Sequence, residues 1–574
     1  MIGGRAIKPC FIHLFFSFFF FLMTLPSQAI AAGQNITPII SCLLLSGHQS
    51  ATVAHAGLLY QDYPGNCLSC HAKEAQNMSG STHYQWMGDA PDMVNEIGIK
   101  QGKLTNAVNS YCINITGDWQ LCGKCHAGRG LRPDDAGAGL ENIDCLVCHS
   151  EEYAKVRTRL PDGSMGVVSP TDSMVQNVHK TTRLTCLKCH ATAGGGDGVK
   201  RGDLSMATST NADPNFDVHM NTSGNNLTCQ ACHQFKNHKT LGKGSDLRAT
   251  DDIVRGSEIS CTTCHTAMAT TGHTDSTIDR HAARGKIACQ VCHIATYAKV
   301  ATETQRDWRT HEDGTDATTC DTNNPCPGPP FLVKAPDLIP KYKWWNRKSD
   351  NYLLGDDASR TFDTVLTTYP TSRPLGNFDL NDTTTKIYPF KYKTAIQPKT
   401  VGDNRLVALD TLIYLGGTGN VTEAIESGLV NMGYQGNEAV EWITTDTYQL
   451  LNHGVEPAEK ALSCDACHSG STGLSISTRM PFAELGYHDF RSQDLCTLCH
   501  DSKSATRVDM HNRHVRSEGY ACNACHGIGA PLKDTKYQVC VSCHDDGIPP
   551  ATTQKIHTKH VTEEHYPCST CHTF

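Results

Sequence analysis

One short pattern of reactive residues, Cys-x-x-Cys-His, recurs twelve times in the 574-residue sequence. Two thiols three positions apart can add to the two vinyl groups of one haem, and the adjacent histidine then supplies an axial ligand to the iron. Zinc sites and redox dithiols also use Cys-x-x-Cys pairs, but neither requires a histidine directly after every second cysteine. The repeat therefore predicts twelve covalent haems c and a protein that moves electrons.

The motifs, numbered 1 to 12 in chain order, assign the haem-attachment cysteines and the proximal iron ligands. The attachment residues are Cys67 and Cys70, Cys122 and Cys125, Cys145 and Cys148, Cys186 and Cys189, Cys229 and Cys232, Cys261 and Cys264, Cys289 and Cys292, Cys464 and Cys467, Cys496 and Cys499, Cys522 and Cys525, Cys540 and Cys543, and Cys568 and Cys571. The proximal ligands are His71, His126, His149, His190, His233, His265, His293, His468, His500, His526, His544 and His572.

The remaining histidines are numerous enough to supply a second axial ligand to nearly every haem. Haems with two histidine ligands have no open iron position, so they carry electrons without substrate chemistry. For each candidate the alternative is a surface or core imidazole, and this alternative is strongest for His311, which lies in a polar stretch. The other candidates are His55, His83, His179, His219, His238, His273, His281, His453, His488, His511, His514, His557, His560 and His565.

The N-terminus and the charge balance indicate an exported protein that does not bind nucleic acid. A basic start, an apolar run from Phe11 to Leu25 and small residues at Ala29 and Ala31 predict a signal peptide over residues 1–31. An uncleaved anchor is one alternative, and a lipoprotein-like site at Cys42 is a weaker one. The 58 acidic against 50 basic residues give a formal net charge of −8. We expect a periplasmic or otherwise secreted protein.

The spacing of the motifs predicts two haem-rich ends around a haem-poor middle. Only 39% of the residues are hydrophobic, so stacked haems must supply much of the core, and we expect a mainly α and coil fold with little sheet. The middle contains a strand-like piece at 386–392 and an apolar helical face over 422–431. Cys320 and Cys326 lie there, and a local disulfide is favoured over two free thiols.

The sequence from about residue 55 to 470 resembles the octahaem tetrathionate reductases. The resemblance rests on NIDCLVCH, GGGDGVKRGDL, FDVHM, HAARGKIACQVCHIATYAK, WWNRKSDNYLLGD, RPLGNFDLNDTTTKIYPFK and ALSCDACHS. It implies an octahaem reductase-like domain over 32–475, with the haem of motif 2 as the catalytic one. It further implies that the iron of this haem has His126 as its proximal and Lys200 as its distal ligand, with Cys112, Asn109 and Asp197 close by.

Motifs 9 to 12 have no counterpart in that family, so residues 476–574 are predicted to form a separate tetrahaem module, an electron inlet or docking partner.

Two functions are compatible with the whole pattern. One is a periplasmic reductase of tetrathionate, nitrite or hydroxylamine that receives electrons from a quinol dehydrogenase or another cytochrome. The other is a non-catalytic electron conduit. Lys391, Lys393 and Lys399 are candidates for attracting an anionic substrate, with surface lysines as the alternative.

Overall fold

A computed structural model describes residues 54–95, 97–108, 116, 119–191, 204–242, 259–266, 273, 286–377, 382, 384–467, 479–481 and 484–485. The predicted signal peptide lies outside these residues, and so do motifs 9 to 12 of the predicted C-terminal module. In the part of the chain that is described, no helix combines the length and the apolar character needed to cross a membrane.

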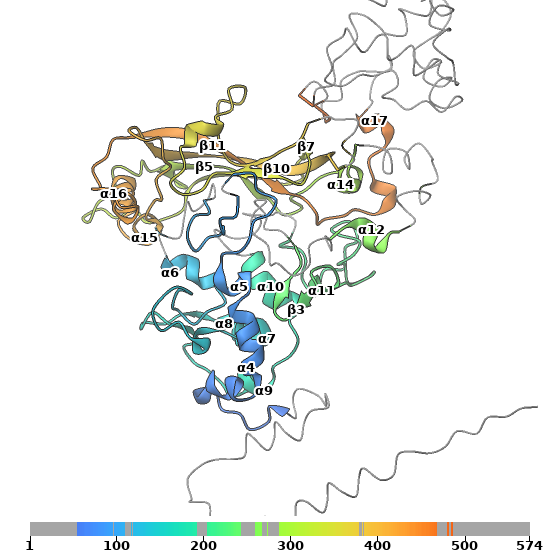
Figure 1. The fold of residues 1–574 in the computed structure, drawn as a ribbon, viewed down its shortest axis with the longest axis vertical. Helices are drawn as coiled ribbons and strands as arrows, with labels where there is room; N and C mark the ends of the chain where they lie inside the picture. The colour runs from blue at the N-terminus through green and yellow to red at the C-terminus, as the bar shows by residue number, and fades with distance from the viewer. Residues whose placement is uncertain are drawn as a thin grey trace, which may run out of the picture. The chain divides into compact units, whose positions relative to one another are not determined.

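The first half of the described chain consists of short helices joined by turns and two small β-ribbons (Figure 1). The longest helix, α4, has 15 residues and carries motif 1. The helical elements are η2 (Tyr60–Asp62), α4 (Gly65–Ser79), α5 (Thr82–Gln85), α6 (Trp119–Cys122), η4 (Gly123–Cys125), η5 (Leu140–Asn142), α7 (Leu146–His149), α8 (Glu151–Val156), α9 (Ser173–Gln176), α10 (Arg183–His190), α11 (Cys229–Cys232), α12 (Cys261–Cys264) and α14 (Cys289–His293). The ribbons pair β1 (Thr158–Arg159) with β2 (Met165–Gly166), and β3 (Phe235–Lys236) with β4 (Lys239–Thr240).

The haem-poor middle forms a mixed seven-stranded sheet, with strand order β6-β5-β10-β11-β9-β8 and β7 also paired with β10. The strands β10 and β11 pair antiparallel from Phe390 opposite Leu450 to Thr400 opposite Val440, whereas β5 joins β10 in parallel and β9 joins β11 in parallel. The strands are β5 (Thr302–His311), β6 (Pro330–Ala335), β7 (Lys341–Trp345), β8 (Ser349–Asn351), β9 (Tyr369–Pro374), β10 (Lys386–Thr400) and β11 (Val440–Leu450).

This sheet shows that the expected mainly helical fold with little sheet is wrong. The strand-like piece at 386–392 is confirmed, but it belongs to a strand of 15 residues. Lys391, Lys393 and Gln397 are buried on one face of β10, so the alternation of polar and apolar residues that marks a half-buried strand is hidden. A segment without haem motifs must also build its own core, and long paired strands provide one.

A hydrophobic core joins the sheet to two helices, α15 (Thr411–Gly416) and α16 (Val421–Asn431). The helix expected over 422–431 is confirmed as α16, which buries the predicted apolar face with Ala424, Ile425 and Leu429. Its first turn is capped because the Asn420 side chain accepts hydrogen bonds from the backbone N–H groups of Thr422 and Glu423. Later elements are η6 (Ala358–Thr361), η7 (Ala458–Lys460) and α17 (Cys464–Cys467).

Replacing Gly428 by alanine should lower the free energy of unfolding by about 1–3 kcal/mol, because overpacking a filled site forces the backbone to shift. A Cβ atom at Gly428 would lie 2.3 Å from the carbonyl oxygen of Ala408. Gly65→Ala in α4 is the matched control, since a Cβ there meets nothing within 4 Å. Denaturant titrations of both variants test this, and equal stability of the two would contradict the close packing of α16.

Candidate haem centres

Each described motif lies on or beside a single turn of helix. The second cysteine follows the first by three positions, and residues three apart on a helix share one face. The elements that carry motifs 1 to 8 are α4, α6 with η4, α7, α10, α11, α12, α14 and α17. This local geometry suits two thioether bonds to one porphyrin edge.

Six motif histidines each face a histidine from a different part of the chain. The ring centroids are 6.2 Å apart for His71 with His55, 6.4 Å for His149 with His238, 6.1 Å for His190 with His83, 6.1 Å for His233 with His453, 6.0 Å for His265 with His219, and 6.3 Å for His293 with His273.

These separations fit one metal ion between two imidazoles. A metal–imidazole bond of about 2.0–2.1 Å puts the metal about 3.1 Å from the ring centroid, so two axial imidazoles on one metal have centroids about 6.3 Å apart. Six independent pairs lie within a few tenths of an ångström of that value. The residues present therefore fit six haems with two histidine ligands each.

The protonation state of several of these rings also suits ligation, which requires a nitrogen lone pair. Burial lowers the pKa of His149 and of His293, in both cases reinforced by neighbouring imidazoles. Burial likewise lowers the pKa of His238. His219 differs, because a hydrogen bond to Asp217 raises its pKa, and Asp217 is thereby placed to orient that ring.

Contacts between thiols show which motifs are neighbours. The thiol of Cys67 contacts that of Cys145, which brings motif 1 beside motif 3. Further contacts join motifs 2 and 4 through Cys125 and Cys189, motifs 4 and 5 through Cys186 and Cys229, and motifs 6 and 7 through Cys261 and Cys289. Haems attached at these sites would lie close to one another, as electron transfer between them requires.

His126 of motif 2 has different surroundings from the other six described motif histidines. Its ring centroid lies 5.2 Å from Tyr84, 5.3 Å from Trp86 and 5.2 Å from Trp119, and among the described residues no second imidazole faces it. The side chain is 1% exposed, and burial lowers its pKa to about 4. Its Nε2 donates to the carbonyl oxygen of Tyr84 at 2.5 Å, so ligation through Nε2 would replace this hydrogen bond.

A buried ion pair holds the backbone of motif 2 in place. Arg157 Nε donates to Asp144 Oδ2 at 2.5 Å, while its Nη2 donates to the carbonyl oxygens of His126 and Gly128 at 2.9 and 2.7 Å. The hydroxyl of Tyr63 donates to the other carboxylate oxygen at 2.8 Å. Sequence reasoning missed this network and the aromatic rings around His126. The only signals were the acidic residue directly before motif 3 and the tryptophan three positions before motif 2.

The predicted catalytic residues other than His126 lie outside the described part of the chain, so their positions stay predictions. Val108, just before the segment with Asn109 and Cys112, is fully buried in the core cluster that includes Trp308 of β5. The site residues outside the described part are Asn109, Cys112, Asp197, Lys200, His281, His468, Cys496, Cys499, His500, Cys522, Cys525, His526, Cys540, Cys543, His544, Cys568, Cys571, His572, His488, His511, His514, His557, His560 and His565.

Two other histidines bind protein groups rather than facing a motif histidine. His179 accepts a hydrogen bond from the backbone N–H of Glu151 at 3.1 Å and its Nδ1 lies 2.7 Å from the carbonyl oxygen of Lys180. The structure therefore places His179 beside motif 3. Among the described histidines, none has its ring at the distance from His179 that a shared metal ion would require. His311, the histidine least expected to ligate haem, lies instead beside a disulfide of Cys320 and Cys326, and this predicted disulfide is confirmed.

Two family models for cytochromes c match separate parts of the chain. Residues 66–150 match the family model described as cytochrome c554 and c-prime, and residues 304–471 match the one described as bacterial cytochrome c. An uncharacterized protein of Archaeoglobus fulgidus is 26% identical over 222 residues, which are 30% of this chain and 73% of that protein. An octahaem cytochrome c from Shewanella oneidensis superposes with a TM-score of 0.62 at 26% identity, over 78% of this chain and 98% of that structure.

The chain is thus a multihaem c-type cytochrome with covalently bound haem c. Its described fold is similar to that of the octahaem cytochrome c over nearly the whole length of that protein. The match to the bacterial cytochrome c model covers nearly the whole sheet from β5 to β11 together with all of motif 8. The sheet is therefore part of the cytochrome architecture rather than an unrelated insertion.

Replacing Asp144 by alanine should destabilise the protein by about 3–5 kcal/mol, because it leaves the buried Arg157 cation without its carboxylate. Asp134→Ala is the matched control, since Asp134 pairs with Arg132 at a half-exposed site where such a pair contributes less than about 1 kcal/mol. Denaturant unfolding of the two variants measures the difference. If both variants lost less than about 1 kcal/mol of unfolding free energy, the Asp144 network would not stabilise motif 2.

Replacing His453 by alanine should convert one haem from low spin to high spin, because His453 is the imidazole that faces His233 of motif 5. His179→Ala should leave the number of low-spin haems unchanged, because its ring contacts backbone groups. Magnetic circular dichroism of the oxidised proteins counts high-spin haems in each variant. The opposite pattern, a new high-spin haem in His179→Ala alone, would refute this assignment of axial pairs.

Proposed function

We propose that this cytochrome is a reductase of small sulfur or nitrogen oxy-compounds, with the haem of motif 2 as the substrate site. The observation that carries the proposal is the contrast between His126 and the other six described motif histidines, all of which face a second imidazole. An iron with two histidine ligands has no position for substrate, whereas one with a different distal ligand can exchange it. The resemblance to the octahaem tetrathionate reductases supplies Lys200 as that ligand.

The residues around His126 have definite tasks in this proposal. The low pKa of His126, caused by burial, keeps the ring neutral, and the three aromatic rings exclude water from it. Arg157 fixes the carbonyl oxygens of His126 and Gly128 and so prevents motif 2 from shifting. Haem iron, when bound, supplies the electrons and a Lewis acid for the substrate oxygen. Lys200 must be neutral to bind iron, so desolvation has to depress its pKa.

The second candidate function is an electron conduit without a substrate site. It is favoured by the six imidazole pairs and by the thiol contacts that link motifs 1 and 3, 2 and 4, 4 and 5, and 6 and 7. The same relay is needed by a reductase, because electrons must reach motif 2 through its neighbour motif 4. We therefore propose twelve haems in all, with motifs 9 to 12 as the inlet for a periplasmic quinol dehydrogenase or another cytochrome.

The three lysines considered for substrate attraction have no part in this proposal. Lys391, Lys393 and Lys399 are at most 1% exposed, so they are not surface lysines. Lys393 Nζ lies 2.9 Å from Glu303, and Lys399 Nζ lies 2.6 Å from Glu441. Burial would raise the pKa of Glu303, but the Lys393 and Arg306 cations outweigh it and lower the pKa. These charges belong to the internal packing of the sheet.

Replacing Lys200 by alanine should abolish reduction of tetrathionate, nitrite and hydroxylamine, and should remove a spectroscopic signature of lysine ligation from one haem. Lys334→Ala is the matched control, because Lys334 is an exposed lysine on β6. Electron paramagnetic resonance of the oxidised proteins reports the ligands, and steady-state assays with a reduced viologen report turnover.

Two outcomes of that experiment would overturn the reductase proposal. If wild type shows no lysine-ligated haem and reduces none of the three compounds, the protein is an electron conduit. If turnover is present and unchanged in Lys200→Ala, the substrate site is at another haem. Loss of both the signature and the turnover in Lys200→Ala alone supports motif 2 as the site.

A further inference from the structure

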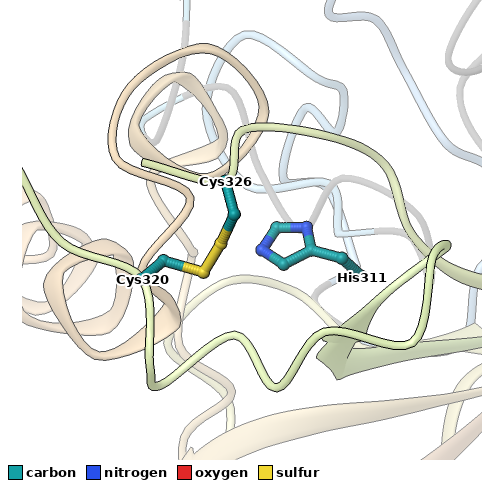
Figure 2. Close-up of side chains that lie close together, drawn as sticks. All are labelled: His311, Cys320 and Cys326. Atoms are coloured by element: carbon teal, nitrogen blue, oxygen red, sulfur yellow. A yellow bond between two sulfur atoms is a disulfide. The ribbon is translucent and has the colours of Figure 1, made fainter. Parts of the chain in front are cut away.

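A second group of metal-ligating side chains lies away from the haem motifs, at the end of β5. His311, Cys320 and Cys326 each offer one ligand atom, and these atoms lie within 4.8 Å of one another. Figure 2 shows the imidazole of His311 turned edge-on toward the disulfide of the two cysteines. His311 is 3% exposed and Cys320 is 1% exposed, so two of the three groups are almost fully buried.

The ring of His311 is fixed in this orientation by its surroundings. It stacks on Tyr414 with the centroids 4.6 Å apart, and its Nε2 lies 2.9 Å from the carbonyl oxygen of Gly419. Its Nδ1 is buried and has no hydrogen-bond partner. The ring nitrogen that faces the disulfide in Figure 2 is Nε2, so binding a metal through it would replace the hydrogen bond to Gly419 and leave the ring proton on Nδ1.

Backbone contacts hold the two cysteines in place independently of the disulfide. The Asn420 side chain, which also caps α16, donates to the carbonyl oxygen of Cys320 at 2.6 Å. The backbone N–H of Cys326 donates to the carbonyl oxygen of Thr418 at 2.9 Å. Gly419 passes so close to Cys326 that a Cβ would lie 2.4 Å from its carbonyl oxygen. Because these contacts do not involve sulfur, cutting the disulfide leaves both cysteines beside His311.

We propose that reduction of the Cys320–Cys326 disulfide creates a binding site for a thiophilic divalent cation of the Zn²⁺ class, formed by the two thiolates and the His311 imidazole. Two sulfurs and one imidazole are a donor set that Zn²⁺ prefers and that Mg²⁺ and Ca²⁺ avoid. No carboxylate belongs to this cluster of described residues. The disulfide form has no thiolate to offer, so metal binding at this site depends on the redox state.

The chemistry balances with a phosphine as reductant. A water-soluble trialkylphosphine gives two electrons to the S–S bond and becomes the phosphine oxide with the oxygen of one water, whose two hydrogens complete the two thiols. Binding of Zn²⁺ then displaces one proton from each thiol, so two protons leave per metal ion. The imidazole binds through a lone pair, with its own proton on the other ring nitrogen.

The test compares zinc binding by the full haem-loaded protein before and after reduction. After anaerobic removal of the phosphine, equilibrium dialysis against buffered Zn²⁺ and elemental analysis should find one more zinc ion per chain in the reduced than in the oxidised protein. Zinc K-edge X-ray absorption, which haem iron does not obscure, should show two sulfur neighbours at about 2.3 Å and an imidazole.

Two variants control for other thiols. Reduced protein with Cys320→Ser and Cys326→Ser should not gain this zinc ion, and His311→Ala should bind it at least about tenfold more weakly. Equal zinc content in reduced wild type and the double variant would overturn the proposal. If the double variant does not fold, the wild-type spectrum decides alone, because reduced protein without a two-sulfur zinc shell also refutes the site.

Discussion

The dominant constraint on this structure is the short reach of an iron ion, which can join two imidazoles only when their rings lie about 6 Å apart. The six described histidine pairs obey this constraint, and some of them join segments that are far apart in sequence, as His233 and His453 do. Each haem thus acts as a cross-link as well as an electron carrier. Several motifs lie on helices of only four or five residues, where haems rather than long helices would tie the segments together.

Where motifs are absent, the chain stabilises itself in a different way. Residues 302–450 form long paired strands over a conventional hydrophobic core that includes Trp308 and Tyr414. The sheet also buries charge, and Lys393 is tolerated there because Glu303 lies 2.9 Å away. The cytochrome therefore combines two kinds of interior, one organised by metal ligation and one by apolar packing with compensated charges.

The sequence predicted what depends on local spacing and failed where distant segments meet. The haem motifs, the helix at α16 and the disulfide of Cys320 and Cys326 are all short-range features. The sheet was missed because buried lysines in β10 obscure its pattern. The pairing of distal histidines has no local signal at all, since His83 precedes motif 2 yet faces His190 of motif 4. For the same reason, His179 could not be told apart from the histidines that face a motif.

His126 is the described motif histidine whose surroundings depart from those of the others. Its motif has the same Cys-x-x-Cys-His pattern as the others. The side chains of Tyr84, Trp86 and Trp119 surround the His126 ring, whereas each of the other described motif histidines faces a second imidazole. Among the described residues no second histidine ties this ring to a distant segment, so other contacts must hold the described part of motif 2. The buried Asp144–Arg157 pair does so by binding the backbone of motif 2 directly. Among the described residues, this ion pair fixes the backbone of motif 2 in the way that paired histidines fix the other described motifs.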